Sequence, residues 1–445
     1  VSAFGCFDDC NNFMGGYFLL HGKRLFSEIF FNHAPFMAYI SWFVQLISTP
    51  ENLYELILRH RQSLLVFSFL FNVLLLFRFG IPAFAFALFY ELTKFYLFGD
   101  RFLAEPFIVY PLIYLVGLGW MKLQKKKLNL FDYVFAGVCT WFIVFMREPY
   151  VPVALILFFY LLMNPLRSVN KNFKSSKLTR TSLRQSHFKN FHSLPFLKNQ
   201  FNLNKKSILA FGIFLILTLV TLFLHDVGEF IFNAITVNVG LATGEIRGVL
   251  HWIKIFFYPI YLFFGGEWGY FRYLILSFNV LFLISSVLLL IKKQWKLVLY
   301  IWIVLGLLNI RWVEPGKAFY GAFHMLCWYA VFLFVSFMML EFVYKKSKKI
   351  AYVLIALYTG IFVFHIFSPL SFIHTKPDPQ YELITNYGIP MQVGTVINVL
   401  SKPTDTLFVD GFDDIIYWQS KRFSTYPYSW YTSLMPAHKK YTDAR

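Results

Sequence analysis

The sequence predicts an all-α polytopic membrane protein with interfacial helices in its first outer loop and a small α/β extracytoplasmic tail. One observation is composition: 58% of the 445 residues are hydrophobic, 21% are aromatic, and the mean hydropathy is +0.56. These values exceed those of ordinary soluble domains. The other is the placement of the 23 acidic residues, of which Glu91, Asp132 and Glu341 alone lie in or behind the apolar runs. The acidic chemistry is therefore expected outside the membrane.

Ten apolar runs are long enough to cross, or nearly cross, about 30 Å of hydrocarbon. They lie at residues 63–79, 82–98, 106–120, 131–146, 150–163, 207–225, 270–291, 297–311, 318–344 and 350–368. A further run at 249–264 is interpreted as interfacial or re-entrant, because counting it as a crossing would turn the lysines at 292–293 outward. We therefore predict a transmembrane domain at 63–368 with about ten spans.

Orientation follows from four short basic stretches between these runs. Residues 122–127, 167–206, 292–296 and 345–349 contain about half of the 41 lysines and arginines and no acid. Because such residues are retained on the cytoplasmic side, we predict a multi-pass protein of the cell membrane with loop 164–206 in the cytoplasm. The net charge of +18 then reflects topology and contact with anionic lipids, and no nucleic-acid partner is expected.

The remaining two parts are expected on the outer face. Residues 1–62 form the first extracytoplasmic loop, and residues 369–445 form a tail module. The chain starts at Val1 with no signal segment and ends within a strand-and-helix pattern, so we expect further residues at both ends. A disulfide between Cys6 and Cys10 is compatible with this placement, although their spacing does not imply one.

The first outer loop concentrates polar residues. It holds the acid pair Asp8 and Asp9, two adjacent glycines at 15–16, and a stretch at 17–26, beginning with Tyr17, that we predict to be helical. Two short amphipathic pieces follow at 37–47 and 52–61. Both are too short and polar to span, so they are predicted to lie on the membrane surface before the chain enters at Leu64.

These residues resemble the GT-C class of polyprenyl-phosphate-sugar glycosyltransferases, which includes the protein O-mannosyltransferases and the bacterial lipid A aminoarabinose transferases. The acid pair, the helix at 17–26 and the aromatic-x-His-x-Pro segment at 31–35 are similar to that family's first loop. So are Glu105 followed by proline, and the tail segments 406–411 and 416–422. In the segment before Pro35, where the family often has an acid, the chain has Asn32, with Glu28 as the nearby acidic substitute.

The resemblance implies an inverting transfer of sugar from a polyprenyl-phosphate-linked donor to an outer acceptor of unknown identity. A carboxylate must accept the acceptor's proton, and either Asp8 or Asp9 has that role. Cations bind the donor phosphate, and acids and amides support the acceptor. The expected phosphate ligands are His33, Lys23, Arg24, Arg101 and Arg147, and the supporting residues are Glu28, Asn32, Asp100 and Glu105. The first loop has no Asp-x-Asp, so no obligatory metal or cofactor is expected.

Other interpretations stay open. A transporter or lipid flippase would also be polytopic and basic, but it would place ionisable residues near the middle of its spans. Another lipid-linked glycan polymerase or ligase would share the donor chemistry. Locally, the acid pair can serve as a helix cap, Arg147 with Glu148 as an exposed ion pair, and His324 as a packed residue. Glu91 and Lys94, about one turn apart, are expected to pair.

Overall fold

The computed structural model describes residues 8–163, 204–237, 269–308, 322–367, 378–409 and 414–425. The predicted re-entrant run at 249–264, nearly all of the loop at 164–206, Cys6 and the last twenty residues of the tail lie outside the described residues.

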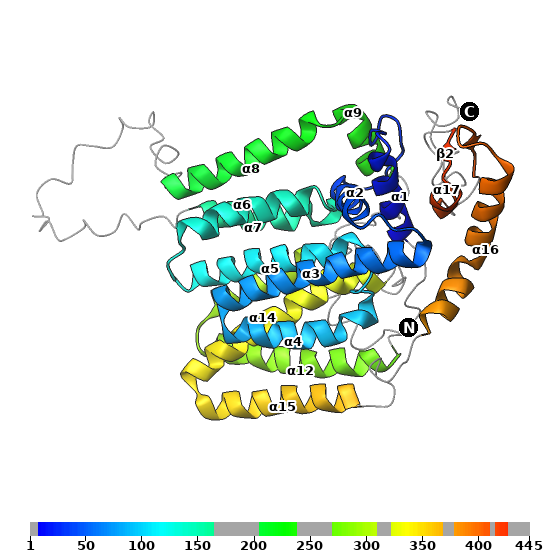
Figure 1. The fold of residues 1–445 in the computed structure, drawn as a ribbon. Helices are drawn as coiled ribbons and strands as arrows, with labels where there is room; N and C mark the ends of the chain where they lie inside the picture. The colour runs from blue at the N-terminus through cyan, green and yellow to red at the C-terminus, as the bar shows by residue number, and fades with distance from the viewer. Residues whose placement is uncertain are drawn as a thin grey trace, which may run out of the picture.

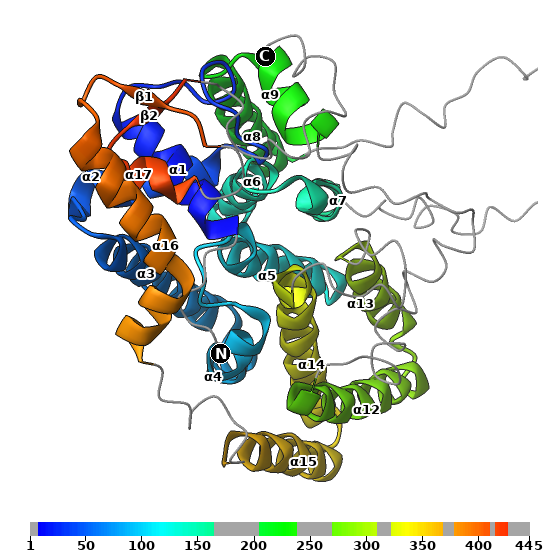
Figure 2. The same ribbon diagram turned by 90° about the vertical axis from the view of Figure 1, so that its right-hand side faces the viewer.

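The long helices of the described part run side by side in one bundle (Figures 1 and 2). Each coincides with one of the ten apolar runs. They are α3 (Leu53–Phe79), α4 (Ile81–Thr93), α5 (Ala104–Leu123), α6 (Leu130–Val144), α7 (Val151–Leu162), α8 (Lys205–Phe223), α12 (Gly269–Ile291), α13 (Trp295–Leu308), α14 (Leu326–Lys346) and α15 (Lys348–Phe367).

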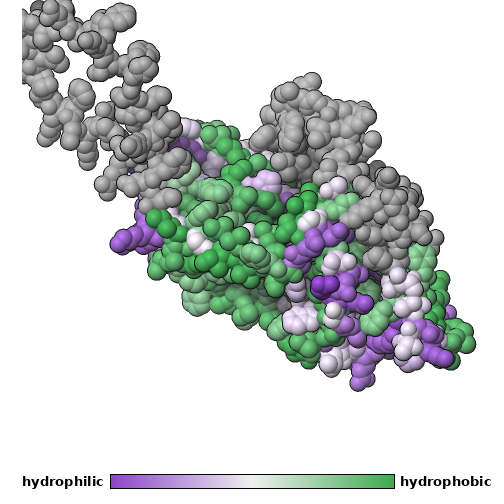
Figure 3. All heavy atoms as spheres, turned by 90° about the horizontal axis from the view of Figure 1, so that it is seen from above, coloured by the Kyte–Doolittle hydropathy of each residue, from purple (hydrophilic) through white to green (hydrophobic). Residues whose placement is uncertain are grey.

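Five helices in the described part are long and apolar enough to cross a membrane, namely α3, α5, α8, α14 with the turn before it, and α15. The chain is therefore a helical membrane protein, and the number of ten crossings stays a prediction. Helices α5 and α14 are buried along nearly their whole length, as expected for helices that are apolar all round. They form the centre of the bundle, and Figure 3 shows apolar side chains along the outside between more polar ends.

The lysine-bearing turns gather at one end of the bundle. The turns between α5 and α6, between α12 and α13 and between α14 and α15 lie on the left in Figure 1. Two of them pass through a left-handed residue, Lys125 with a φ of 59° and Lys293 with a φ of 58°. One end of the bundle is thus strongly basic.

Each acid that the sequence places within the bundle is ion-paired. The buried carboxylate of Asp132 accepts from Nε and Nη2 of Arg78 at 2.5 and 2.8 Å. Glu91 lies 2.5 Å from Nζ of Lys94, which confirms the expected pair, and Glu341 pairs with Lys345. The desolvation of a buried charge is offset only by a well-placed partner. These three paired acids therefore have a structural role.

The remaining helices and strands form a layer at the opposite end. They include α1 (Asp8–Leu20), α2 (Phe36–Ser48), α9 (Val227–Phe230), α16 (Pro379–Leu400) and α17 (Ile415–Ser420). Three 3₁₀ turns and a π-helical turn occur at Lys94–Leu97, Glu148–Tyr150, Ala322–Met325 and Ile231–Thr236. Strands β1 (Thr406–Leu407) and β2 (Phe423–Ser424) pair in parallel. Figure 2 looks onto this layer and shows α17 between α1 and α16.

The first loop folds differently from the prediction in two places. The helix expected at 17–26 is wrong, because α1 starts at Asp8 and ends at Leu20, and the chain turns at Gly22 with a φ of 79°. The surface helix at 52–61 is also wrong, since these residues are the first turns of α3. The side chain of Asn52 caps α3 by accepting from the Glu55 amide at 2.9 Å. The short helix predicted at 37–47 is confirmed as α2.

The two glycines of α1 allow it to pack closely on α2. A Cβ at Gly16 would lie 2.6 Å from the carbonyl carbon of Ser41, and a Cβ at Gly15 would lie 2.8 Å from Cβ of Ala38. These distances are shorter than van der Waals contact, so any larger residue must push the two helices apart.

We therefore expect Gly16→Ala to destabilise the protein by about 1–3 kcal/mol through overpacking. The control is Gly212→Ala in α8, where nothing lies within 4 Å and alanine should raise stability by about 0.5–1 kcal/mol through helix propensity. Reversible unfolding in mixed detergent micelles measures both changes. A Gly16 variant as stable as the native chain would contradict the close packing.

Candidate active site

A buried acid lies in the layer opposite the basic turns. Asp9 is on the first turn of α1 and is 2% exposed. Burial of a carboxylate is costly unless charges or hydrogen-bond donors compensate it, so Asp9 requires polar surroundings. Asp8 begins the same helix.

Residues from three other elements meet near Asp9. Tyr387 of α16 is buried, and its burial raises its pKa, with a further rise from the negative charge of Asp9. The charges of Arg61 and Arg101 oppose this rise in the pKa of Tyr387. The tyrosine hydroxyl is thus within electrostatic range of one carboxylate and two guanidinium groups.

The two arginines come from different elements. Arg61 lies on the third turn of α3, and its Nη1 is 3.9 Å from Oδ2 of Asp100. Arg101 follows Asp100 in the segment before α5, is largely buried, and has its guanidinium carbon 4.3 Å from the centre of the Phe98 ring. Both guanidinium groups therefore act electrostatically on the same tyrosine as Asp9.

Aromatic rings and an amide lie around the next turn of α1 after Asp9. Asn12 donates to the carbonyl of Phe102 at 3.0 Å. Phe13, one turn after Asp9 on the same face of α1, has its ring centre 4.4 Å from that of His60, which lies 4.6 Å from that of Phe102. His60 is held by Ser41 at 2.8 Å and by the Leu56 carbonyl at 2.6 Å. These contacts therefore join α1 and α3 to the segment before α5.

A second buried acid lies at the N-terminal end of α5. Glu105 is fully buried, and Oε2 lies 3.2 Å from Nη1 of Arg147 while Oε1 lies 3.2 Å from Nδ1 of His324. Arg147 is 3% exposed and lies 5.6 Å from the ring of Phe323. The interpretation of Arg147 as part of an exposed ion pair is therefore wrong, because its guanidinium is buried against Glu105. Both oxygens of Glu105 are engaged by cationic or ring nitrogen atoms.

The aromatic-x-His-x-Pro segment is buried beside α1. Asn32 is fully buried and accepts at 2.9 Å from Nδ2 of Asn11. His33 is 7% exposed, and its ring meets that of Phe31 edge-on at 6.2 Å. This segment thus packs against α1 within the same layer.

Three predicted site residues lie on the exposed turn after α1. Lys23 is exposed, and Arg24 pairs with Glu28 at 3.2 Å on the surface. The Arg24 amide and side chain lower the pKa of Glu28. This pair is separate from the buried group around Asp9.

The tail closes onto α1 through an aromatic cluster. Tyr17 stacks on Phe423 with ring centres 5.9 Å apart, and burial raises the pKa of Tyr17 to about 12 against the opposing charge of Arg422. Arg422 donates to the Asn398 and Ser401 carbonyls at 3.2 and 2.7 Å. These contacts hold α16, and with it Tyr387, over the start of α1.

His225, just after α8, supplies a pH-dependent contact in this layer. Its Nδ1 donates to the Thr221 carbonyl at 2.7 Å, and Nε2 accepts from the Tyr39 hydroxyl at 3.0 Å. Burial lowers its pKa below the ordinary value.

Because the folded state disfavours the charged imidazole, the unfolded chain binds more protons below about pH 6.5, and stability is lost as the pH falls through that value. We expect the unfolding free energy to drop more between pH 7.5 and pH 5 in the native chain than in His225→Gln, which keeps a hydrogen-bonding side chain but does not titrate. Equal drops in the two proteins would contradict this role of His225.

Sequence reasoning missed three residues of the two buried groups. The sequence pattern places Arg61 on a surface helix, Tyr387 carries no local motif, and His324 is expected to be a packed residue. Arg61 lies nine positions after Asn52, and the helix cap at Asn52 is the local signal that a helix begins there and includes Arg61. Tyr387 and His324 meet their partners only through folding.

Within the described ranges, no group of three His, Cys, Asp or Glu side chains is placed to hold a metal ion. The geometry defines a helical membrane protein with a buried acid and two arginines at the end of the bundle opposite its basic turns. No family model matches the chain, and neither the curated proteins nor the solved structures contain a significant match.

Proposed function

We propose that this chain is an inverting glycosyltransferase that moves a sugar from a polyprenyl-phosphate-linked donor to an extracytoplasmic acceptor. The observation that carries the proposal is the group formed by Asp9, Arg61, Arg101 and Tyr387 at the end of the bundle away from the basic turns. A buried carboxylate beside two guanidinium groups suits a proton acceptor next to a phosphate.

The reaction follows from these roles. The acceptor hydroxyl or amine attacks the anomeric carbon and gives its proton to the Asp9 carboxylate. The bond from that carbon to the phosphate oxygen breaks, and the electron pair leaves with the lipid phosphate. Arg61 and Arg101 stabilise the charge that develops on the phosphate, which removes the need for a general acid.

Other predicted residues take supporting roles in this proposal. Arg147 is held by Glu105, so it shapes the outer end of α5 instead of binding the donor. His33 and Asn32 support the position of α1. Lys23 and Arg24 are exposed cations that attract the lipid phosphate as it approaches the site. Asp100 orients Arg61.

The proposed topology has about ten crossings, with the lysine-bearing turns in the cytoplasm and the Asp9 layer outside. The positive-inside rule supports it. So does the disulfide-bonded state of Cys10, since disulfides persist in oxidising compartments. The tail at 369–445 then covers the acceptor side of the site, as the contact of α17 with α1 indicates (Figure 2).

The test is transfer of radiolabelled sugar in proteoliposomes from a panel of polyprenyl-phosphate sugars, with the lipid extract and protein of the native host as acceptors. Transfer from one donor with inversion at the anomeric carbon supports the proposal. If no donor gives transfer while polyprenyl phosphates move between leaflets, the protein is a flippase and the proposal fails.

A further inference from the structure

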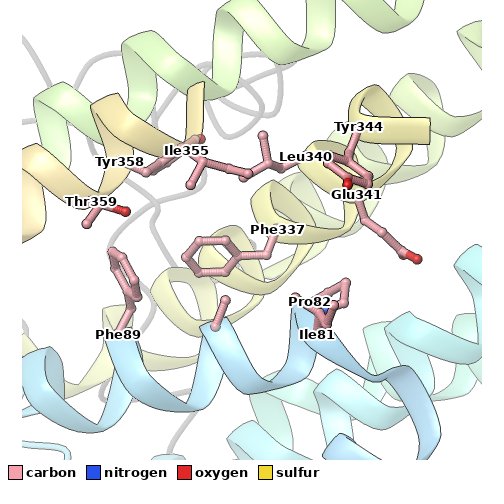
Figure 4. Close-up of a pocket in the computed structure, with 11 residues that line it drawn as sticks. Ile81, Pro82, Phe89, Phe337, Leu340, Glu341, Tyr344, Ile355, Tyr358 and Thr359 are labelled. Atoms are coloured by element: carbon pink, nitrogen blue, oxygen red, sulfur yellow. The ribbon is translucent and has the colours of Figure 1, made fainter. Parts of the chain in front are cut away.

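A cavity opens between α4, α14 and α15, away from the Asp9 layer. Its volume is about 270 Å³, near the lower end of ligand pockets at roughly 300 Å³. Figure 4 shows its lining side chains converging from the three helices. The lining is almost wholly carbon, from residues such as Ala85, Phe89, Phe337, Leu340 and Ile355.

The lining residues follow helical periodicity. Those from α14 lie at 337, 340, 341 and 344, and those from α4 at 81, 82, 85 and 89. Both sets repeat every three or four residues, so each helix turns one continuous face to the cavity. The cavity therefore results from the packing of these three helices, and it is elongated along their axes.

The cavity lies at the basic end of the bundle. It includes the first turn of α4 and the last turns of α14, which adjoin the turn at 345–349 (Figure 1). The one acid of its lining, Glu341, is paired with Lys345. Lys346, Lys348 and Lys349 are exposed and follow shortly after Tyr344, the last lining residue of α14, so positive charge lies just beyond this end of the apolar cavity.

We propose that this cavity binds an anionic phospholipid of the cytoplasmic leaflet, with one acyl chain between α4, α14 and α15 and the phosphate at Lys346, Lys348 and Lys349. An acyl chain matches an apolar slot in shape and chemistry. A basic cluster at the cytoplasmic end of transmembrane helices selects anionic over zwitterionic headgroups. This site is separate from the proposed sugar transfer and does not depend on it.

Photolabelling of the full chain in phosphatidylcholine nanodiscs tests the site. The probe is phosphatidylglycerol with a diazirine in the acyl chain, and labelled peptides are mapped by mass spectrometry. We expect label on α4, α14 and α15, and a loss of about tenfold when Ala85→Phe fills the slot. Lys346→Gln/Lys348→Gln/Lys349→Gln should reduce labelling by the anionic probe about tenfold or more, with no change for a phosphatidylcholine probe.

The matched control is Lys292→Gln/Lys293→Gln/Lys296→Gln, which removes the same charge from a turn at the same end and should leave labelling unchanged. The lysine variants change only exposed residues, so they report on the site even if Ala85→Phe fails to fold. Equal labelling by the two probes would overturn the headgroup assignment. Competition by polyprenyl phosphate, or labelling that persists when the slot is filled, would overturn the proposed occupant.

Discussion

Replacing Asp9 with asparagine is expected to reduce the turnover number about 10²–10⁴-fold, the usual contribution of a general base. The substitution keeps the size of the side chain and removes the negative charge that the proposed reaction needs. Donor affinity should stay within a few-fold, because Arg61 and Arg101 keep their charges. The measurement is single-turnover transfer at saturating donor together with an independent donor-binding assay.

Two further variants make this result specific. Asp405→Asn makes the same chemical change in an exposed turn of the tail, where the carboxylate accepts from the Lys402 amide, and it should leave turnover unchanged. Asp8→Asn separates the members of the acid pair. If Asp8→Asn abolished transfer and Asp9→Asn did not, the base would be Asp8, and activity that survives the double substitution would overturn the mechanism.

Glu105→Ala is expected to be the most destabilising single change in the outer part of the bundle, at about 3–5 kcal/mol. It leaves the buried guanidinium of Arg147 without the carboxylate that holds it and removes the partner of His324. Unfolding in mixed micelles measures this loss.

A double variant separates the lost pair from a lost volume. In Glu105→Leu/Arg147→Met both charges are replaced by apolar side chains, and most of the stability should return because no charge is left buried alone. Glu28→Ala removes an exposed pair and should have little effect. A double variant as unstable as Glu105→Ala would show that the ion pair is not the cause.

The bundle could be predicted from the sequence because each of its helices leaves a local pattern. Apolar runs at 106–120 and 318–344 gave α5 and α14, and the acid-free basic stretches marked the turns at one end. The boundaries of α1 and α3 were predicted less accurately. Asn52 is a strong helix cap, but the polar residues that follow it looked like a surface piece rather than the start of a long helix.

The candidate site was predictable only in part, because only some of its residues are marked by a local sequence pattern. Asp9, Asp100 and Arg101 were predictable because each is a polar residue outside the apolar runs. The link from Glu105 to His324 spans more than two hundred positions in sequence, and Tyr387 reaches Asp9 through the tail. Contacts of this kind depend on packing, which composition and spacing do not encode.

The uninterrupted length of helix α3 couples the two ends of the bundle. It runs as a single helix of 27 residues from Leu53 to Phe79, with neither glycine nor proline along it. Arg61, beside the candidate site, and Arg78, paired with Asp132 near the basic end, are therefore fixed about 26 Å apart on one stiff rod. A tilt of this helix at one end must shift the other end as well, so the position of Arg61 is coupled to the ion pair between Arg78 and Asp132.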